Sequence, residues 1–188
     1  MTKPPLIIIA GPACTGKTTL GQYLAQELHL PFISKDGPKE LLFDCLGWSD
    51  RAWSRKVGRA SIEILFYFVE SQLRAGQSFI VESNFSPPLH AERFLKLKQQ
   101  YDFEPFQIQC ICDGDVLFER FKQRAESSVR HPGHVDKLNY EEFKPILLKG
   151  RYDPLEIGGR MYEVDTTDLV SLDYKKIVEE IRAVLSYA

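Results

Sequence analysis

The segment GPACTGKT, residues 11–18, has the residue types and spacing of a loop that binds phosphate groups. It matches G-x-x-x-x-G-K-[ST] without a deviation. Glycine lets the backbone turn tightly and bring its N–H groups close to an anion, and a helix that starts there adds the positive end of its dipole. Lys17 supplies a point charge for the β- and γ-phosphates, and the Thr18 hydroxyl can ligate a Mg²⁺ that bridges them. We expect ATP and Mg²⁺ to be held by Gly11, Pro12, Ala13, Cys14, Thr15, Gly16, Lys17, Thr18 and Thr19.

Two acidic residues come directly after short apolar runs that are typical of strands. Asp36 follows residues 31–34, and Glu82 follows residues 78–81. Parallel strands deliver such residues to the carboxyl edge of a sheet, beside the phosphate loop. There the Asp36 carboxylate could orient a substrate hydroxyl or accept its proton, or it could instead cap the following helix. Glu82, with Asn84 close behind, could hold Mg²⁺ through water, contact the substrate, or only organise the loop.

Three arginines follow the fourth apolar run. Arg120 and Arg124 are four residues apart on a predicted helix, so they project together, and Arg130 comes just before a turn. Phosphoryl transfer spreads negative charge over the phosphate oxygens, and guanidinium groups stabilise that charge well. We therefore predict an arginine-rich lid over approximately residues 120–150, although these arginines could also form a solvated helix face.

Two further segments are open to a functional and a structural interpretation. Arg51, Arg55 and Arg59 form a ladder on one face of a predicted helix, which could hold an anionic substrate or simply face solvent. The loop at Thr166, after the fifth predicted strand, could contact adenine through its backbone, or it could be an ordinary turn. We keep Arg55, Arg59 and Thr166 as candidate binding residues.

The histidines and cysteines show no spacing typical of a metal site. His131 and His134 share one turn, but no third ligand is evident, so we expect them to build the turn. Cys110 and Cys112 would lie on the same face of a strand, and we expect them to be small core residues.

Short apolar runs alternate with helical periods along the whole chain, which indicates a parallel sheet covered by helices. We predict one domain, residues 1–188, with a three-layer α/β/α fold and right-handed crossovers. Asp115 and Asp173 are expected to cap helices, and Gly76 to end one. These signals do not give the strand order. The predicted strands are residues 6–10, 31–34, 78–81, 106–112 and 161–164.

The composition is that of an ordinary globular protein. The chain has 188 residues, 44% of them hydrophobic and 27% charged, with a formal net charge of -2. This near-neutral charge makes nucleic acid a possible but less favoured partner. No apolar run approaches the roughly 20 residues of a membrane helix, and no signal-peptide pattern is present, so we expect a cytoplasmic protein without a membrane partner. The sequence leaves the oligomeric state open.

Four segments together resemble a known group of proteins. They are GPACTGKTT, the ISKD segment ending at Asp36, FIVESNF, and RFKQRAESSVRHPGH from Arg120 to His134. The chain resembles the small P-loop phosphotransferases related to chloramphenicol phosphotransferase, zeta toxins and polynucleotide kinase domains, AAA-type small ATP-binding proteins of the P-loop NTPase superfamily. The resemblance implies a five-stranded sheet of order 2-3-1-4-5 and a mobile lid. It also implies Asp36 as base, Arg124 and Arg130 as catalytic lid arginines, and Arg120 nearer the adenine.

Absent motifs narrow the class further. The chain has neither the N-K-x-D segment that reads guanine nor the L-S-G-G-Q signature of ATP-binding cassettes. We therefore predict an ATP- and Mg²⁺-dependent kinase that moves the γ-phosphate to a hydroxyl of a small molecule. A polynucleotide 5′-hydroxyl kinase, a regulatory ATP-binding module and a simple NTPase remain alternatives.

Overall fold

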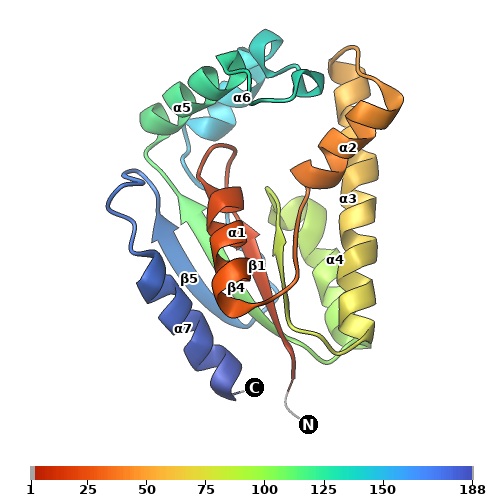
Figure 1. Ribbon diagram of the computed structural model, residues 1–188, viewed down its shortest axis with the longest axis vertical. Coiled ribbons are helices and arrows are strands. Elements are labelled where there is room, and N and C mark those ends of the chain that lie inside the picture. The colour runs from red at the N-terminus through yellow and green to blue at the C-terminus, as the bar shows by residue number, and fades with distance from the viewer. Residues whose placement is uncertain (1–2, 188) are drawn as a thin grey trace.

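Five parallel strands form one sheet in the order β2-β3-β1-β4-β5 (Figure 1). This finding confirms the strand order that the resemblance implies. The computed structural model describes residues 3–187, and the side chains of residues 3–183. The strands are β1 (Pro5–Ala10), β2 (Phe32–Ser34), β3 (Phe79–Glu82), β4 (Glu104–Ile111) and β5 (Arg160–Asp165).

Helices cover both faces of the sheet, as predicted. Helices α1 and α7 pack on one face, and α3 and α4 on the other. The segment from α5 to α6 lies beyond the end of the sheet at which β1 runs into the phosphate loop (Figure 1). None of the helices within residues 3–187 is both long and apolar enough to cross a membrane. The helices are α1 (Lys17–Leu28), α2 (Asp36–Leu46), α3 (Arg51–Arg74), α4 (Pro87–Gln100), α5 (Gly114–Glu126), α6 (Tyr140–Leu147) and α7 (Tyr174–Tyr187), with 3₁₀ turns η1 (Pro132–His134) and η2 (Asp136–Leu138).

The central strand β1 is apolar on both faces because both faces are covered. Leu6 and Ile8 pack against α3 and α4, whereas Ile7 and Ile9 pack against α1 and α7. All four side chains are fully buried. Each contributes about 1.5–3 kcal/mol of hydrophobic free energy. This two-sided packing fixes the strand that carries the phosphate loop.

Two of the three predicted helix ends are confirmed, and one is wrong. Asp173 accepts the N–H of Lys176 at the start of α7, and Gly76 follows α3 with φ 65°. Asp115, however, does not cap α5, because Asp113 accepts the N–H groups of Asp115 and the residue after it. The cap and the helix start two residues earlier than predicted, and at the first helical residue, Gly114, a Cβ would lie 2.1 Å from the backbone oxygen of Leu148 after α6.

The cysteine pair has the core role predicted for it. Cys110 is fully buried on the α1 face of β4, and Cys112, just beyond the strand, packs with α5 and α6. Burial raises the pKa of the Cys110 thiol to about 12, so this sulfur stays protonated and unreactive.

Candidate functional site

The phosphate loop joins the end of β1 to the start of α1, as its motif predicts. Gly11 and Gly16 both have positive φ, 141° and 78°. The loop closes around one carbonyl: the Pro12 oxygen accepts the Lys17 Nζ at 2.6 Å and the Thr15 hydroxyl at 3.0 Å. The helix N-terminus that binds anions in such loops therefore lies at Lys17.

Gly11 is required by both its backbone angle and its surroundings. A Cβ built there would lie 2.3 Å from the backbone oxygen of Cys110. We expect Gly11→Ala to lower the free energy of unfolding by about 3 kcal/mol or more, because strain and a backbone clash add. Gly76→Ala is the matched control, since Gly76 also has positive φ but no atom within 4 Å, and should cost about 1 kcal/mol. Urea unfolding of both variants measures the difference, and equal costs would contradict it.

Thr18 and Glu82 form a pair of hard oxygen donors beside the loop. The Thr18 hydroxyl donates to Glu82 Oε2 at 2.8 Å, which joins the start of α1 to the end of β3. Glu82 is 5% exposed, and burial raises the pKa of its carboxyl, although Lys17 opposes the shift. A hydroxyl and a carboxylate so close together are oxygen ligands of the kind that Mg²⁺ prefers. These two residues thus fit a magnesium site.

Asp36 lies at the carboxyl edge of the sheet, as expected, but it does not cap α2. It is the first residue of that helix, and the Ser34 hydroxyl accepts the N–H of Gly37 instead. The Asp36 carboxylate faces the cleft and accepts Arg130 Nη1 at 3.0 Å. Burial opposes its ionisation, but the positive charges of His134, when protonated, and Arg130 outweigh that effect and hold the pKa of Asp36 well below its usual value.

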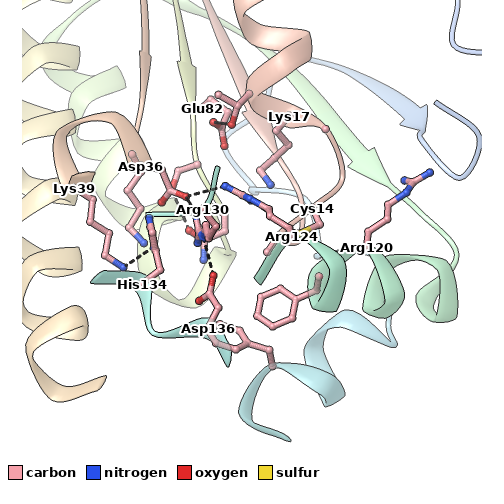
Figure 2. A pocket seen from close by; sticks show the side chains of 18 of the residues that line it. Cys14, Lys17, Asp36, Lys39, Glu82, Arg120, Arg124, Arg130, His134 and Asp136 are labelled. Carbon is pink, nitrogen blue, oxygen red and sulfur yellow. Dashed lines mark hydrogen bonds and ion pairs between the residues drawn. The ribbon is translucent and has the colours of Figure 1, made fainter. Parts of the chain in front are cut away.

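The predicted lid contains α5, η1, η2 and α6, and its arginines have different partners. The Arg130 side chain is 10% exposed and bridges Asp36 and Asp136, with its Nε 2.7 Å from Asp136. Arg124 is 3.8 Å from Asp36 and points toward the phosphate loop, where its Nη1 lies 3.9 Å from Cys14 Sγ (Figure 2). These contacts place the Arg124 guanidinium between the phosphate loop and Asp36, and the Arg130 guanidinium between Asp36 and Asp136.

Arg120 lies nearer the exit of β5 and is committed to backbone carbonyls. It donates to the oxygens of Thr166 and Thr167 at 2.7 and 2.8 Å. The Thr166 side chain is buried and donates to the oxygen of Ile111, so only the backbone of this loop faces Arg120. Arg120 therefore positions the β5 exit loop beside the cleft.

The arginine ladder of α3 is only partly brought to the cleft. Arg51 lines it and donates to Glu142 of α6 at 2.6 Å. Arg55 also pairs with Glu142, at 3.0 Å, but does not line the cleft, and Arg59 is exposed outside it. The ladder thus connects α3 to the lid through one carboxylate.

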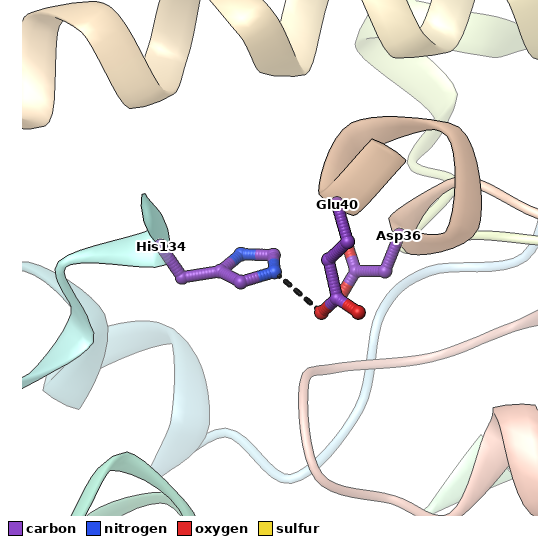
Figure 3. A group of neighbouring side chains, drawn as sticks. All are labelled: Asp36, Glu40 and His134. Carbon is purple, nitrogen blue, oxygen red and sulfur yellow. Dashed lines mark hydrogen bonds and ion pairs between the residues drawn. The ribbon is translucent and has the colours of Figure 1, made fainter. Parts of the chain in front are cut away.

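The structure adds His134 to the site, which the sequence assigned only to the turn. This side chain is 2% exposed, and its Nε2 lies 2.9 Å from Glu40 Oε1. Both histidines lie in the turn, as predicted, and the structure adds what the sequence does not reveal: Asp36 and Glu40 bring possible ligand atoms within 4.8 Å of one another and of the His134 ring (Figure 3). Arg130 contacts both carboxylates, so a metal ion here would have to displace a guanidinium.

One cavity of about 510 Å³ contains most of these groups, a size typical of small-molecule sites (Figure 2). Four further candidates, Gly11, Pro12, Thr15 and Thr166, lie outside its lining. The predicted residues that line the cavity are Ala13, Cys14, Gly16, Lys17, Thr18, Thr19, Asp36, Glu82, Asn84, Arg120, Arg124 and Arg130.

Comparisons with known proteins agree with this geometry. The family model of the AAA domain matches residues 6–145. No protein among those with curated functions matches the chain. A solved structure described as a candidate kinase, from Chloroflexus aurantiacus J-10-fl, is 43% identical, with a TM-score of 0.87, and the match covers 97% of this chain and 98% of that one.

Two more distant structures share the fold. A sugar kinase from Janibacter sp. HTCC2649 is 14% identical, with a TM-score of 0.58 and coverage of 100% of this chain and 96% of that one. A gluconokinase from Sinorhizobium meliloti 1021 is 17% identical, with a TM-score of 0.52 and coverage of 100% and 94%. The fold is thus the α/β P-loop fold of small kinases.

Proposed function

This chain belongs to the AAA domain family of P-loop proteins, and we propose that it is an ATP- and Mg²⁺-dependent kinase that transfers the γ-phosphate to a hydroxyl of a small molecule. One observation carries the proposal. A carboxylate that can receive a hydroxyl group, Asp36, faces the phosphate loop across a single cavity, with lid arginines between them. A protein that only binds ATP needs no such carboxylate, and lid arginines that close over the cavity favour transfer over hydrolysis because they keep out water.

The phosphate loop would hold the nucleotide from one side. The Lys17 ammonium would exchange the Pro12 carbonyl for the β- and γ-phosphates, which are stronger acceptors. Thr18 and Glu82 would hold Mg²⁺, which neutralises part of the phosphate charge when it is bound.

Asp36 would receive the acceptor hydroxyl at the other side of the cavity. Its depressed pKa makes it a weak base while Arg130 is attached. Nucleotide phosphates compete with Asp36 for Arg124 and Arg130, and the departure of these guanidinium groups would leave the carboxylate free to hydrogen-bond the hydroxyl. Binding of the nucleotide would thus prepare the acceptor site, and the lid would keep out water that competes for the phosphoryl group.

A transfer screen tests this function directly. Labelled ATP is incubated with wild-type protein and with hydroxyl-bearing compounds, among them nucleosides, sugars, sugar acids and an oligonucleotide with a 5′-hydroxyl. We expect label on a small molecule, dependent on Mg²⁺. Label on the oligonucleotide alone would instead indicate a polynucleotide kinase. ATP turnover that ignores every acceptor would favour a simple NTPase, and nucleotide binding without any turnover would favour a regulatory module.

A further inference from the structure

Two lysines at the start of α2 line the cavity and converge on one spot of α3. Lys35 immediately precedes α2, and Lys39 lies four residues further, so both project to the same side. They meet at Gly58 of α3, where a Cβ would lie 3.8 Å from Lys39 Nζ and 3.9 Å from Lys35 Nζ. Both lysines line the same cavity as Asp36, which places two ammonium groups beside the carboxylate that would receive the acceptor.

Neither ammonium group forms a direct ion pair with a carboxylate among the described side chains, although Asp36 attracts both at longer range. Lys39 is 6% exposed, and its Nζ contacts only uncharged acceptors, Ser54 Oγ at 3.2 Å and His134 Nδ1 at 3.4 Å (Figure 2). Burial lowers the pKa of Lys39 to about 8 and also lowers that of Lys35. A buried ammonium without a direct ion-pair partner destabilises a fold, so its presence in a ligand cavity favours a ligand that supplies a closer negative charge.

Three of the four arginines of the cavity differ from these lysines because each has a carboxylate partner, whereas Arg120 donates to backbone oxygens. Arg51 pairs with Glu142, and Arg124 and Arg130 pair with Asp36. Seven lysine and arginine side chains line the cavity, against three carboxylates. ATP complexed with Mg²⁺ carries only about two negative charges, so it leaves part of this positive charge uncompensated. Among the described side chains outside the phosphate loop, the positive charge of the cavity without an ion pair lies at Arg120, beside the β5 exit loop, and at Lys35 and Lys39, on the acceptor side.

Gly58 leaves the space of a methyl group free where these ammonium groups meet, since a Cβ there would be in van der Waals contact with both. It lies in the middle of a 24-residue helix, a position at which alanine is more stable than glycine. The backbone does not require glycine there, since its φ is not positive. A glycine at that site therefore keeps space open next to the two lysines at a cost to the helix.

We propose that Lys35 and Lys39, above Gly58, form a subsite for a negatively charged group of the acceptor, a carboxylate or a phosphate. The acceptor would then be a hydroxy acid or a phosphorylated hydroxy compound rather than a neutral alcohol. This inference rests on the proposed kinase function, because it assigns the group that anchors the molecule whose hydroxyl reaches Asp36.

The test fills the phosphate loop first, so that added anions report only on the second site. Wild-type protein is saturated with Mg²⁺ and a non-hydrolysable ATP analogue, and its thermal unfolding midpoint is followed as inorganic phosphate or acetate is added. Because a ligand of the native state stabilises it by mass action, we expect the midpoint to rise with the anion that fits. The anion that raises the midpoint at the lower concentration indicates whether the acceptor carries a phosphate or a carboxylate.

Three variants locate the effect. Lys39→Met and Lys35→Gln should bind the anion roughly tenfold to a hundredfold more weakly, because each removes a charged hydrogen-bond donor. Lys39→Met should nevertheless unfold at the same or a higher temperature without anion, since it removes a buried charge; a purely structural lysine would predict the opposite. Gly58→Ala should likewise stabilise the protein and weaken anion binding.

Lys56→Gln, exposed on α3 outside the cavity, controls for non-specific salt effects and should behave as wild type.

The outcomes separate this inference from the kinase proposal. If wild-type protein binds the ATP analogue but its midpoint does not respond to either anion, or if Lys39→Met responds as wild type does, the anion subsite is rejected and the kinase proposal stands. If wild-type protein does not bind the analogue at all, the nucleotide site itself is rejected. A specific response lost in the lysine variants supports the subsite.

Discussion

Replacing Lys17 with alanine is expected to reduce the rate of ATP turnover by about a hundredfold or more and to weaken nucleotide binding. The Lys17 ammonium is 7% exposed, and its closest partner is the loop's own Pro12 carbonyl, a neutral acceptor. Phosphate oxygens are far stronger acceptors for an ammonium group, and donors aimed at developing charge are each worth about 10²–10³ in rate. Binding by calorimetry and turnover by phosphate release measure the two effects.

The fold of this variant must be checked, because Lys17 also helps to close the loop. Loss of one side-chain bond to Pro12 should cost only about 0.5–3 kcal/mol of the free energy of unfolding, so the variant should still fold. Lys56→Ala is the matched control: it also removes a lysine, but from an exposed position outside the cavity. Unaltered turnover in the Lys17 variant would reject residues 11–18 as the nucleotide site.

The parts of the site that follow from the sequence are those that local chain geometry fixes. The loop from Gly11 to Thr18 lies between a strand and a helix, and both are evident from their apolar patterns. Asp36 and Glu82 reach the same edge because parallel strands all end there. Strand order has no such local signal, and only the resemblance to a known family supplied it.

The parts that the sequence does not reveal depend on contacts between distant segments. His134 and Glu40 are 94 residues apart, and Lys39 meets His134 across a similar separation. Nothing in the pattern around Lys39 distinguishes it from any lysine on an amphipathic helix. It is buried because α3 and the lid turn both pack against α2: the Ser54 hydroxyl of α3 accepts a hydrogen bond from its Nζ, and the ring of Phe43 lies 5.5 Å from that of His134.

The α3 ladder was open to two interpretations for a related reason. Spacing of four residues places Arg51, Arg55 and Arg59 on one helix face, but it does not say what that face meets. The structure places Glu142 opposite the first two, so their charge is used to attach the lid to α3. Among the described side chains outside the phosphate loop, the cavity lysines without an ion pair lie instead at the start of α2, at Lys35 and Lys39, and no spacing pattern distinguishes these two from other lysines of the chain.

Asp36→Asn is expected to abolish phosphoryl transfer without weakening ATP binding. The amide keeps the shape of the side chain but cannot accept a proton, and loss of a general base typically costs about 10²–10⁴ in rate. Because Asp36 competes with the nucleotide for Arg130, 3.0 Å away, removal of its charge should leave ATP affinity equal or higher. Labelled-ATP transfer, with nucleotide affinity measured in parallel, tests both parts, and wild-type transfer would reject Asp36 as the base.

The pH dependence of the transfer rate is a second test of the role of Asp36. In the ligand-free protein the pKa of Asp36 is depressed, so the ionised form persists in acid. His134, when protonated, and Lys35 also lower this pKa, and both stay in place when Arg130 turns to the phosphates. Transfer by the wild-type protein should therefore show no loss from Asp36 protonation between about pH 5 and pH 8. A base with a pKa near neutrality would produce such a loss. A rate that does not change with pH in this range requires that Asp36 first orients the hydroxyl and takes its proton only as the new bond to phosphorus forms. That order is expected of a loose transition state.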